Sequence, residues 1–166
     1  MNRRDAIRAG AAGIAAAVVV TPAARGQAPA ANQPELEPIR ALLQRYDEAF
    51  ANQDLDGVMA CFSEKAALMG TGPGEIWSGP DEIKAAHQHF FDGFDKGEQR
   101  FDYEFHLGDI KSDSGWMLTS GNVTGKQEGE EYVFPVNISL TVVKDGGKWL
   151  VAAMHFSVFS AQNQEE

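Results

Sequence analysis

Apolar side chains recur at helical spacing early in the chain. One set is separated by steps of four, three and four residues, which puts it on one helical face: Ile39, Leu43, Tyr46 and Phe50. Pro34 and Glu35 predict where this helix begins, because proline and acidic side chains favour the first helical turn. Tyr46 is therefore expected to point into the core.

Two further helices and a short hairpin are predicted next. Asp54 is a suitable N-cap for a short helix, whose buried face consists of Leu55, Val58, Met59 and Phe62. Residues 66–69 form a strand, which a Gly/Pro loop at 70–74 connects to a return at 75–77. Gly79 and Pro80 open a third helix that ends at Gly97. Its buried stripe consists of Ile83, His87, Phe90 and Phe94.

From residue 100 onward the period of the pattern changes from 3.6 to 2. Four long strands are predicted at 100–110, 115–125, 132–144 and 148–159, with turns rich in Gly and Asp between them. Three helices followed by a strand meander indicate an α+β domain, with helices on one face of an antiparallel sheet. We assign this domain to residues 35–160.

The strand at 132–144 has two distinct faces. One row is apolar: Tyr132, Phe134, Val136, Ile138, Leu140 and Val142. The other row is more polar: Val133, Pro135, Asn137, Ser139 and Thr141. If the helices cover only the apolar row, the polar row faces water. If both faces are covered, a polar-lined pocket lies beneath the helices and the apolar row meets a second subunit. The pattern alone leaves both arrangements open.

The first thirty residues have the layout of an export signal: a basic start, an apolar middle, and small residues at a cleavage site. The pair Arg3-Arg4 is similar to a twin-arginine signal. Ala28-Pro29-Ala30 predicts cleavage after Ala30, which leaves a linker at 31–34 and a disordered tail at 161–166. The mature protein is then periplasmic or secreted. The alternative is an uncleaved anchor or a disordered N-terminal segment.

The net charge of −10 argues against nucleic acid and anionic membranes as partners. Cleavage after Ala30 removes four Arg and one Asp, which takes the charge to −13. Cys61 is a lone cysteine, so no intrachain disulfide forms, and we interpret it as core packing. No metal site is expected, because His87 and His89 point in different directions on a helix, and His106 and His155 lie on separate strands. No cofactor is expected either.

Several short motifs are similar to those of a known superfamily. They are Gln44-Arg45-Tyr46, Asp54-Leu55-Asp56-Gly57, Phe62, Ser78-Gly79, Ile83, Pro135-Val136-Asn137, Trp149 and His155-Phe156-Ser157. With these, residues 36–159 resemble the nuclear-transport-factor-2-like superfamily, which includes SnoaL-like proteins and ketosteroid isomerases. The resemblance implies a cone-shaped α+β barrel of the cystatin-like type: a curved sheet wrapped around three helices, with a pocket in its mouth. It also implies a homodimer through the convex sheet face, so that both sheet faces are covered.

The resemblance also implies roles for single residues. Tyr46 falls on the oxyanion-binding tyrosine of the isomerases, Asn137 on their neutral aspartic acid, and His87 on a tyrosine that supports the oxyanion tyrosine. His87 in this position could accept a hydrogen bond from Tyr46 or relay a proton. Gly70 falls on the catalytic base, and glycine has no side chain to take up a proton. Each of the three polar residues also has a simpler interpretation as a core residue with a satisfied hydrogen bond.

Two functions follow from this pattern. The missing base favours an exported protein that binds a small, largely apolar molecule without catalysis. The alternative is an isomerase, cyclase or dehydratase that uses Tyr46, His87 and Asn137 on an enolisable substrate. In either case the expected pocket residues are Tyr46, Phe50, Met69, Trp77, His87, Asn137, Met154 and Phe156. A third possibility is an interaction module that acts through the sheet face.

Overall fold

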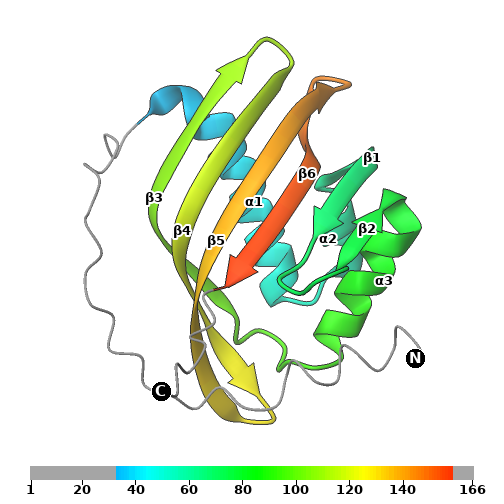
Figure 1. Ribbon diagram of the computed structural model, residues 1–166, viewed down its shortest axis with the longest axis vertical. Helices are drawn as coiled ribbons and strands as arrows, with labels where there is room; N and C mark the ends of the chain where they lie inside the picture. The colour runs from blue at the N-terminus through cyan, green and yellow to red at the C-terminus, as the bar shows by residue number, and fades with distance from the viewer. Residues whose placement is uncertain (1–32, 159–166) are drawn as a thin grey trace, which may run out of the picture. The chain divides into compact units, whose positions relative to one another are not determined.

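The computed structural model of the chain describes residues 33–158 (Figure 1). The predicted signal at 1–30 and tail at 161–166 lie outside this range. A 3₁₀ turn at Pro34–Leu36 comes first, so helix α1 (Glu37–Ala51) begins slightly later than the sequence predicts. The predicted helical face is confirmed, because Ile39, Leu43, Tyr46 and Phe50 are all buried.

Two shorter helices follow the first. Helix α2 (Leu55–Met59) has the predicted cap, since the Asp54 carboxylate accepts a hydrogen bond from the Gly57 N–H at 3.0 Å. Phe62 belongs to the following strand and not to this helix. Helix α3 (Gly79–Phe91) buries Ile83 and His87 as predicted, but it ends at Phe91, well before Gly97.

The sheet has six strands: β1 (Phe62–Met69), β2 (Ile76–Ser78), β3 (Arg100–Lys111), β4 (Ser114–Gln127), β5 (Glu130–Asp145) and β6 (Lys148–Val158). Their order is β2-β1-β6-β5-β4-β3, and the sheet is open. Helix α1 contacts β3 and β6, and α3 contacts β1 and β2 (Figure 1). The predicted α+β class with three helices and a curved sheet is confirmed. One pair, β1 with β6, is parallel, so the sheet is mixed and not antiparallel throughout.

The burial of the two rows of β5 shows which face of this strand the helices cover. Val136, Ile138, Leu140 and Val142 are buried under the helices, and Asn137 is exposed on the opposite face of the sheet. The expectation of a polar row beneath the helices, with the apolar row facing outward, is therefore wrong. Burial of each Val, Ile or Leu side chain contributes roughly 1.5–3 kcal/mol, so covering the apolar row stabilises the fold far more than covering the polar row.

The face of the sheet opposite the helices is termed the outer face below. Exposed apolar side chains on it include Met69, Ile76, Trp116 and Leu118. Two hollows of about 280 Å³ each lie on this face and share Leu118, Ser139 and His155 in their lining. No helix among residues 33–158 is long and apolar enough to cross a membrane.

Candidate functional site

The first polar pair of the interior joins α1 to α3. The Tyr46 hydroxyl lies 3.0 Å from Nε2 of His87, and Nδ1 of His87 lies 2.8 Å from the Ile83 carbonyl. A carbonyl only accepts, so Nδ1 carries the proton and donates to Ile83. Burial lowers the pKa of His87, which keeps the ring neutral and makes Nε2 an acceptor. The Tyr46 hydroxyl therefore donates its proton to His87.

Aromatic rings surround this pair. The ring centroid of Tyr46 lies 5.7 Å from that of Phe50, 5.9 Å from that of Phe62 and 6.5 Å from that of Phe156. Burial raises the pKa of the Tyr46 hydroxyl well above its ordinary value. We call these packed rings on the inner side of the sheet the aromatic cluster.

A second polar pair joins α1 to β3. The Tyr103 hydroxyl donates to Asp47, with its oxygen 3.0 Å from Oδ1 and 2.9 Å from Oδ2. Burial raises the pKa of the Asp47 carboxyl from 3.8 to about 8; the Tyr103 hydrogen bond opposes this rise, and the charge of Glu48 adds to it. Burial also raises the pKa of Tyr103. Asp47 is therefore mostly a neutral carboxylic acid at pH 7.

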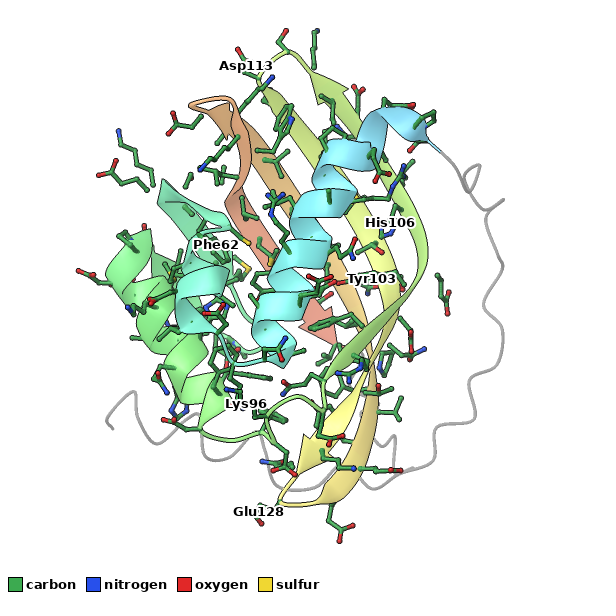
Figure 2. The ribbon with its side chains drawn as sticks, turned by 180° about the vertical axis from the view of Figure 1, so that it is seen from behind. Phe62, Lys96, Tyr103, His106, Asp113 and Glu128 are labelled. Atoms are coloured by element: carbon green, nitrogen blue, oxygen red, sulfur yellow. The ribbon has the colours of Figure 1, made fainter. Side chains whose placement is uncertain are left out.

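His106 lies next to this second pair. The register of β3 against β4 shifts between Tyr103 and Phe105, and this β-bulge brings the Tyr103 and His106 rings to within 5.4 Å of each other. Figure 2 shows both side chains on the side of β3 that α1 covers. Nδ1 of His106 is buried and has no hydrogen-bond partner among residues 33–158. Burial lowers the pKa of His106, and the charge of Arg40 lowers it further.

The structure brings most of the predicted pocket residues to the inner side of the sheet. Tyr46, Phe50, His87 and Met154 are buried there, and Trp77 and Phe156 pack against the same core. The hydrogen bond between Tyr46 and His87 is the contact that the resemblance implies.

Two predicted residues lie elsewhere, and their assignment to an inner pocket is wrong. Asn137 is exposed on the outer face, where its cross-strand neighbours are Ser120 and Ser157. Met69 is 41% exposed on the same face and pairs with His155. Side chains alternate along a strand, so an alignment error of one residue is enough to transfer a side chain to the other face.

Asp47 and Tyr103 are site residues that sequence reasoning missed. Asp47 directly follows Tyr46 in α1, so it borders the apolar helical face without belonging to it. Tyr103 occupies an inward position of a strand whose alternation the sequence does predict. The one sequence signal for this site was the position of Asp47, an acidic residue beside the buried apolar face of α1. Among residues 33–158, no three His, Cys, Asp or Glu side chains are grouped to hold a metal ion.

Comparisons with known proteins agree with this architecture. Solved structures with similar folds include a ketosteroid isomerase-like protein from Erwinia carotovora atroseptica, with 21% identity, 78% of this chain and 99% of that chain covered, and a TM-score of 0.64. A candidate scytalone dehydratase from Novosphingobium aromaticivorans has 16% identity, coverage of 76% and 85%, and a TM-score of 0.68. A protein with a cystatin-like fold from Nostoc punctiforme has 20% identity, coverage of 76% and 92%, and a TM-score of 0.65.

At these identities the structural likeness establishes the fold and not the chemistry. A search of curated protein sequences finds no match. The family model described as a SnoaL-like domain matches residues 39–161, which include α1 from its third residue, the two other α-helices and the whole sheet. The chain belongs to the SnoaL-like domain family.

Proposed function

We propose that the chain is a proton-transfer enzyme of the isomerase or dehydratase type. Its substrate is a small, largely apolar compound that carries a carbonyl or hydroxyl group and binds beside Asp47, against the partly buried ring of Phe101. The observation that carries the proposal is Asp47, a carboxyl whose pKa of about 8 leaves it protonated at pH 7. A general acid works best when its pKa lies near the working pH.

The surroundings of Asp47 suit this role. A neutral carboxylic acid donates a hydrogen bond to a carbonyl oxygen, and the bond strengthens as negative charge develops on that oxygen. Tyr103 holds both carboxyl oxygens, so the acid has a fixed orientation. Half-buried aromatic side chains, among them Phe101 and Phe156, offer an apolar surface on which a ring compound can stack. Two of the structural neighbours are described as isomerase-like and as a candidate dehydratase, in keeping with such chemistry.

The proposal is tested first without a substrate. The infrared spectrum of the wild-type protein at pH 7 is expected to contain the carbonyl band of a protonated carboxylic acid, and this band is expected to be absent from the Asp47→Asn variant. The matched control is Asp56→Asn, which removes an exposed carboxylate. If the wild-type and Asp47→Asn spectra are the same in this region, Asp47 is ionised and the proposed acid is lost.

Activity is tested with 2-tetralone, an aromatic ketone with readily enolised protons. Nuclear magnetic resonance follows the exchange of these protons for deuterium in D₂O. Wild-type protein and Asp56→Asn are expected to accelerate the exchange equally over buffer. Asp47→Asn is expected to lose roughly 10²-fold or more of the acceleration, the typical contribution of a general acid. Full activity in Asp47→Asn contradicts the proposal.

One observation favours the alternative of binding without catalysis. The Tyr46 hydroxyl already donates its proton to His87, so it is not free to donate to a ligand unless this bond opens. In that case the aromatic cluster binds an apolar molecule by burial alone. A ligand found by native mass spectrometry of the protein taken from its own periplasm, bound equally by wild type and Asp47→Asn and released unchanged, supports this second function.

We further propose that residues 1–30 direct export by the twin-arginine route and are removed in the periplasm. The motivation is the layout of this segment, with Arg3-Arg4 ahead of an uncharged apolar run. Replacement of both arginines by lysine is expected to leave the uncleaved protein in the cytoplasm. N-terminal sequencing of the exported protein measures the cleavage site, and a mature protein that begins at Met1 contradicts the proposal.

We also propose that two copies pair through the outer face to form a homodimer. The middle positions of β4, β5 and β6 on this face carry no Asp, Glu, Lys or Arg, and Trp116 and Leu118 are each 42% exposed there. Exposed apolar patches of this kind mark interaction surfaces. Light scattering is expected to give a dimer for wild type and for the control Ser114→Glu, and a monomer for Leu118→Glu. A monomeric wild-type protein at micromolar concentration refutes the pairing.

A further inference from the structure

One titratable side chain lies in the middle of the outer face. His155 belongs to β6, where it is paired with Ser139 of β5 on one side and with Met69 of β1 on the other (Figure 1). It lines both hollows of this face and is half-buried. Both of its cross-strand neighbours are uncharged. Histidine is the side chain whose charge ordinarily changes between about pH 5 and about pH 8, so His155 can alter the charge at the centre of the face.

The charged side chains around this face are remote from His155 or turned away from it. Asp109 lies on β3, three strands from β6, which is about 14 Å at the usual strand spacing. Glu64 and Lys65 are exposed at the end of β1 that is remote from His155. Glu75 holds its carboxylate against the backbone of the β1–β2 loop. None of the ion pairs in the described part of the chain involves His155, so no fixed charge compensates a proton on its ring.

Association of two copies through the outer face changes the surroundings of this ring. A second copy that covers the two hollows removes His155 from water and leaves it among hydroxyl, thioether and aliphatic groups. Burial without an opposite charge nearby disfavours the protonated imidazole. A two-fold dimer uses the same patch on both subunits, so both rings are affected. Each association event therefore favours the loss of two protons, and acid opposes it.

We propose that His155 makes the pairing of two copies depend on pH: the outer faces associate while the ring is neutral and separate when it is protonated. The inference rests on the proposed homodimer and adds its regulation. A group that must lose its proton on pairing supports the dimer at high pH, and this support disappears as the pH falls through the range in which histidine titrates. Because two protons leave per dimer, the dissociation constant rises by up to about 100-fold per pH unit in the acidic part of that range.

The general electrostatics of the chain act in the opposite direction. The net charge of −10 makes two copies repel each other, and acid lowers this negative charge. Acid by itself would therefore favour pairing. A dimer that dissociates in acid is consequently a specific sign of a group such as His155, which gains a positive charge inside the interface.

Sedimentation equilibrium of the full chain between about pH 8 and about pH 5 measures the dissociation constant, with circular dichroism to verify that the chain stays folded. For wild type the constant is expected to rise at least roughly tenfold toward acid pH. The matched control His89→Gln removes an exposed histidine of α3 and is expected to show the same rise. His155→Gln is expected to show no rise. His155→Arg carries a permanent charge and is expected to be a monomer even at about pH 8.

The possible failures separate this inference from the homodimer itself. A wild-type dissociation constant that stays level or falls in acid overturns the control by His155 and leaves the homodimer standing. The same holds if His155→Gln weakens in acid as steeply as wild type, or if His155→Arg pairs as tightly as wild type. A wild-type protein that is monomeric at every pH overturns both the homodimer and this inference, and leaves the proposed role of Asp47 unaffected.

Discussion

Replacement of Asp47 by Asn is expected to change how the stability of the fold depends on pH. The folded chain holds a proton on Asp47 up to a pKa of about 8, whereas the ordinary carboxyl pKa is 3.8. Between these two values the folded state binds one proton that the unfolded state has lost. Stability from this group is therefore fully present below about pH 4 and falls as the pH rises toward 8. The Asn variant has no such proton.

The magnitude follows from the distance between the two pKa values. Each pH unit corresponds to about 1.4 kcal/mol, so the interval from 3.8 to about 8 amounts to about 6 kcal/mol. This is a large share of the roughly 5–15 kcal/mol by which domains of this kind are stable. Asn has nearly the same shape and still offers an oxygen to the Tyr103 hydroxyl. Asp47→Asn is therefore expected to be clearly more stable than wild type above about pH 8 and similar to it near about pH 4.

Urea unfolding of both proteins across this pH range measures the effect. The difference between the two unfolding free energies removes the contribution of the other carboxyl groups, which are the same in both chains. The difference is expected to change by about 1.4 kcal/mol per pH unit in the middle of the window and to level off above about pH 8. A difference that does not vary with pH, or that moves in favour of wild type as the pH rises, refutes the argument that burial protonates Asp47.

Three further substitutions test the packing around the site. Tyr46→Phe leaves Nε2 of buried His87 without its donor and is expected to cost about 1–3 kcal/mol in urea unfolding; an unchanged midpoint contradicts the bond. Asp54→Ala removes the acceptor for the Gly57 N–H and is expected to cost about 1 kcal/mol, whereas Asp54→Asn keeps most of the stability. Gly121→Ala places a methyl group against the backbone of β3 and is expected to lower stability by about 1–3 kcal/mol; thermal unfolding measures the loss, and an unchanged melting temperature would falsify the close approach.

The elements of the fold were predictable because each has a local signal. The helical face with Ile39 and Tyr46 repeats along α1, and the long strands alternate with a period of two. The ends of the elements were less predictable, since tertiary packing decides them. Phe62 fits the apolar face of a helix in the sequence, but in the fold it pairs with Val151 of β6, almost ninety residues away.

The candidate site was predictable only where both partners lie on a recognisable apolar stripe. Tyr46 and His87 belong to two such stripes, and their contact was expected. The pair Asp47 and Tyr103 was not, because the residues are 56 positions apart and neither carries a motif. Asn137 shows the opposite error. The alternation of side chains shows which residues share a face of β5, but not which face the helices cover. The resemblance suggested that the helices cover the face with Asn137, whereas they cover the apolar face.

Charge in the interior follows a consistent rule that bears on the reaction. Tyr46, His87 and Tyr103 are all neutral near pH 7, and Asp47 is largely so, because burial disfavours the charged form of each. The chain as a whole has a net charge of −10. A ligand oxygen that becomes negative beside Asp47 therefore meets a neutral carboxylic acid that can donate to it, and not a carboxylate that repels it. If Asp47 were ionised, the same position would oppose the charge that enolisation creates. The exchange activity should consequently fall as the pH rises past about 8, together with the stability difference, and a rate that keeps rising above that pH separates Asp47 from the chemistry.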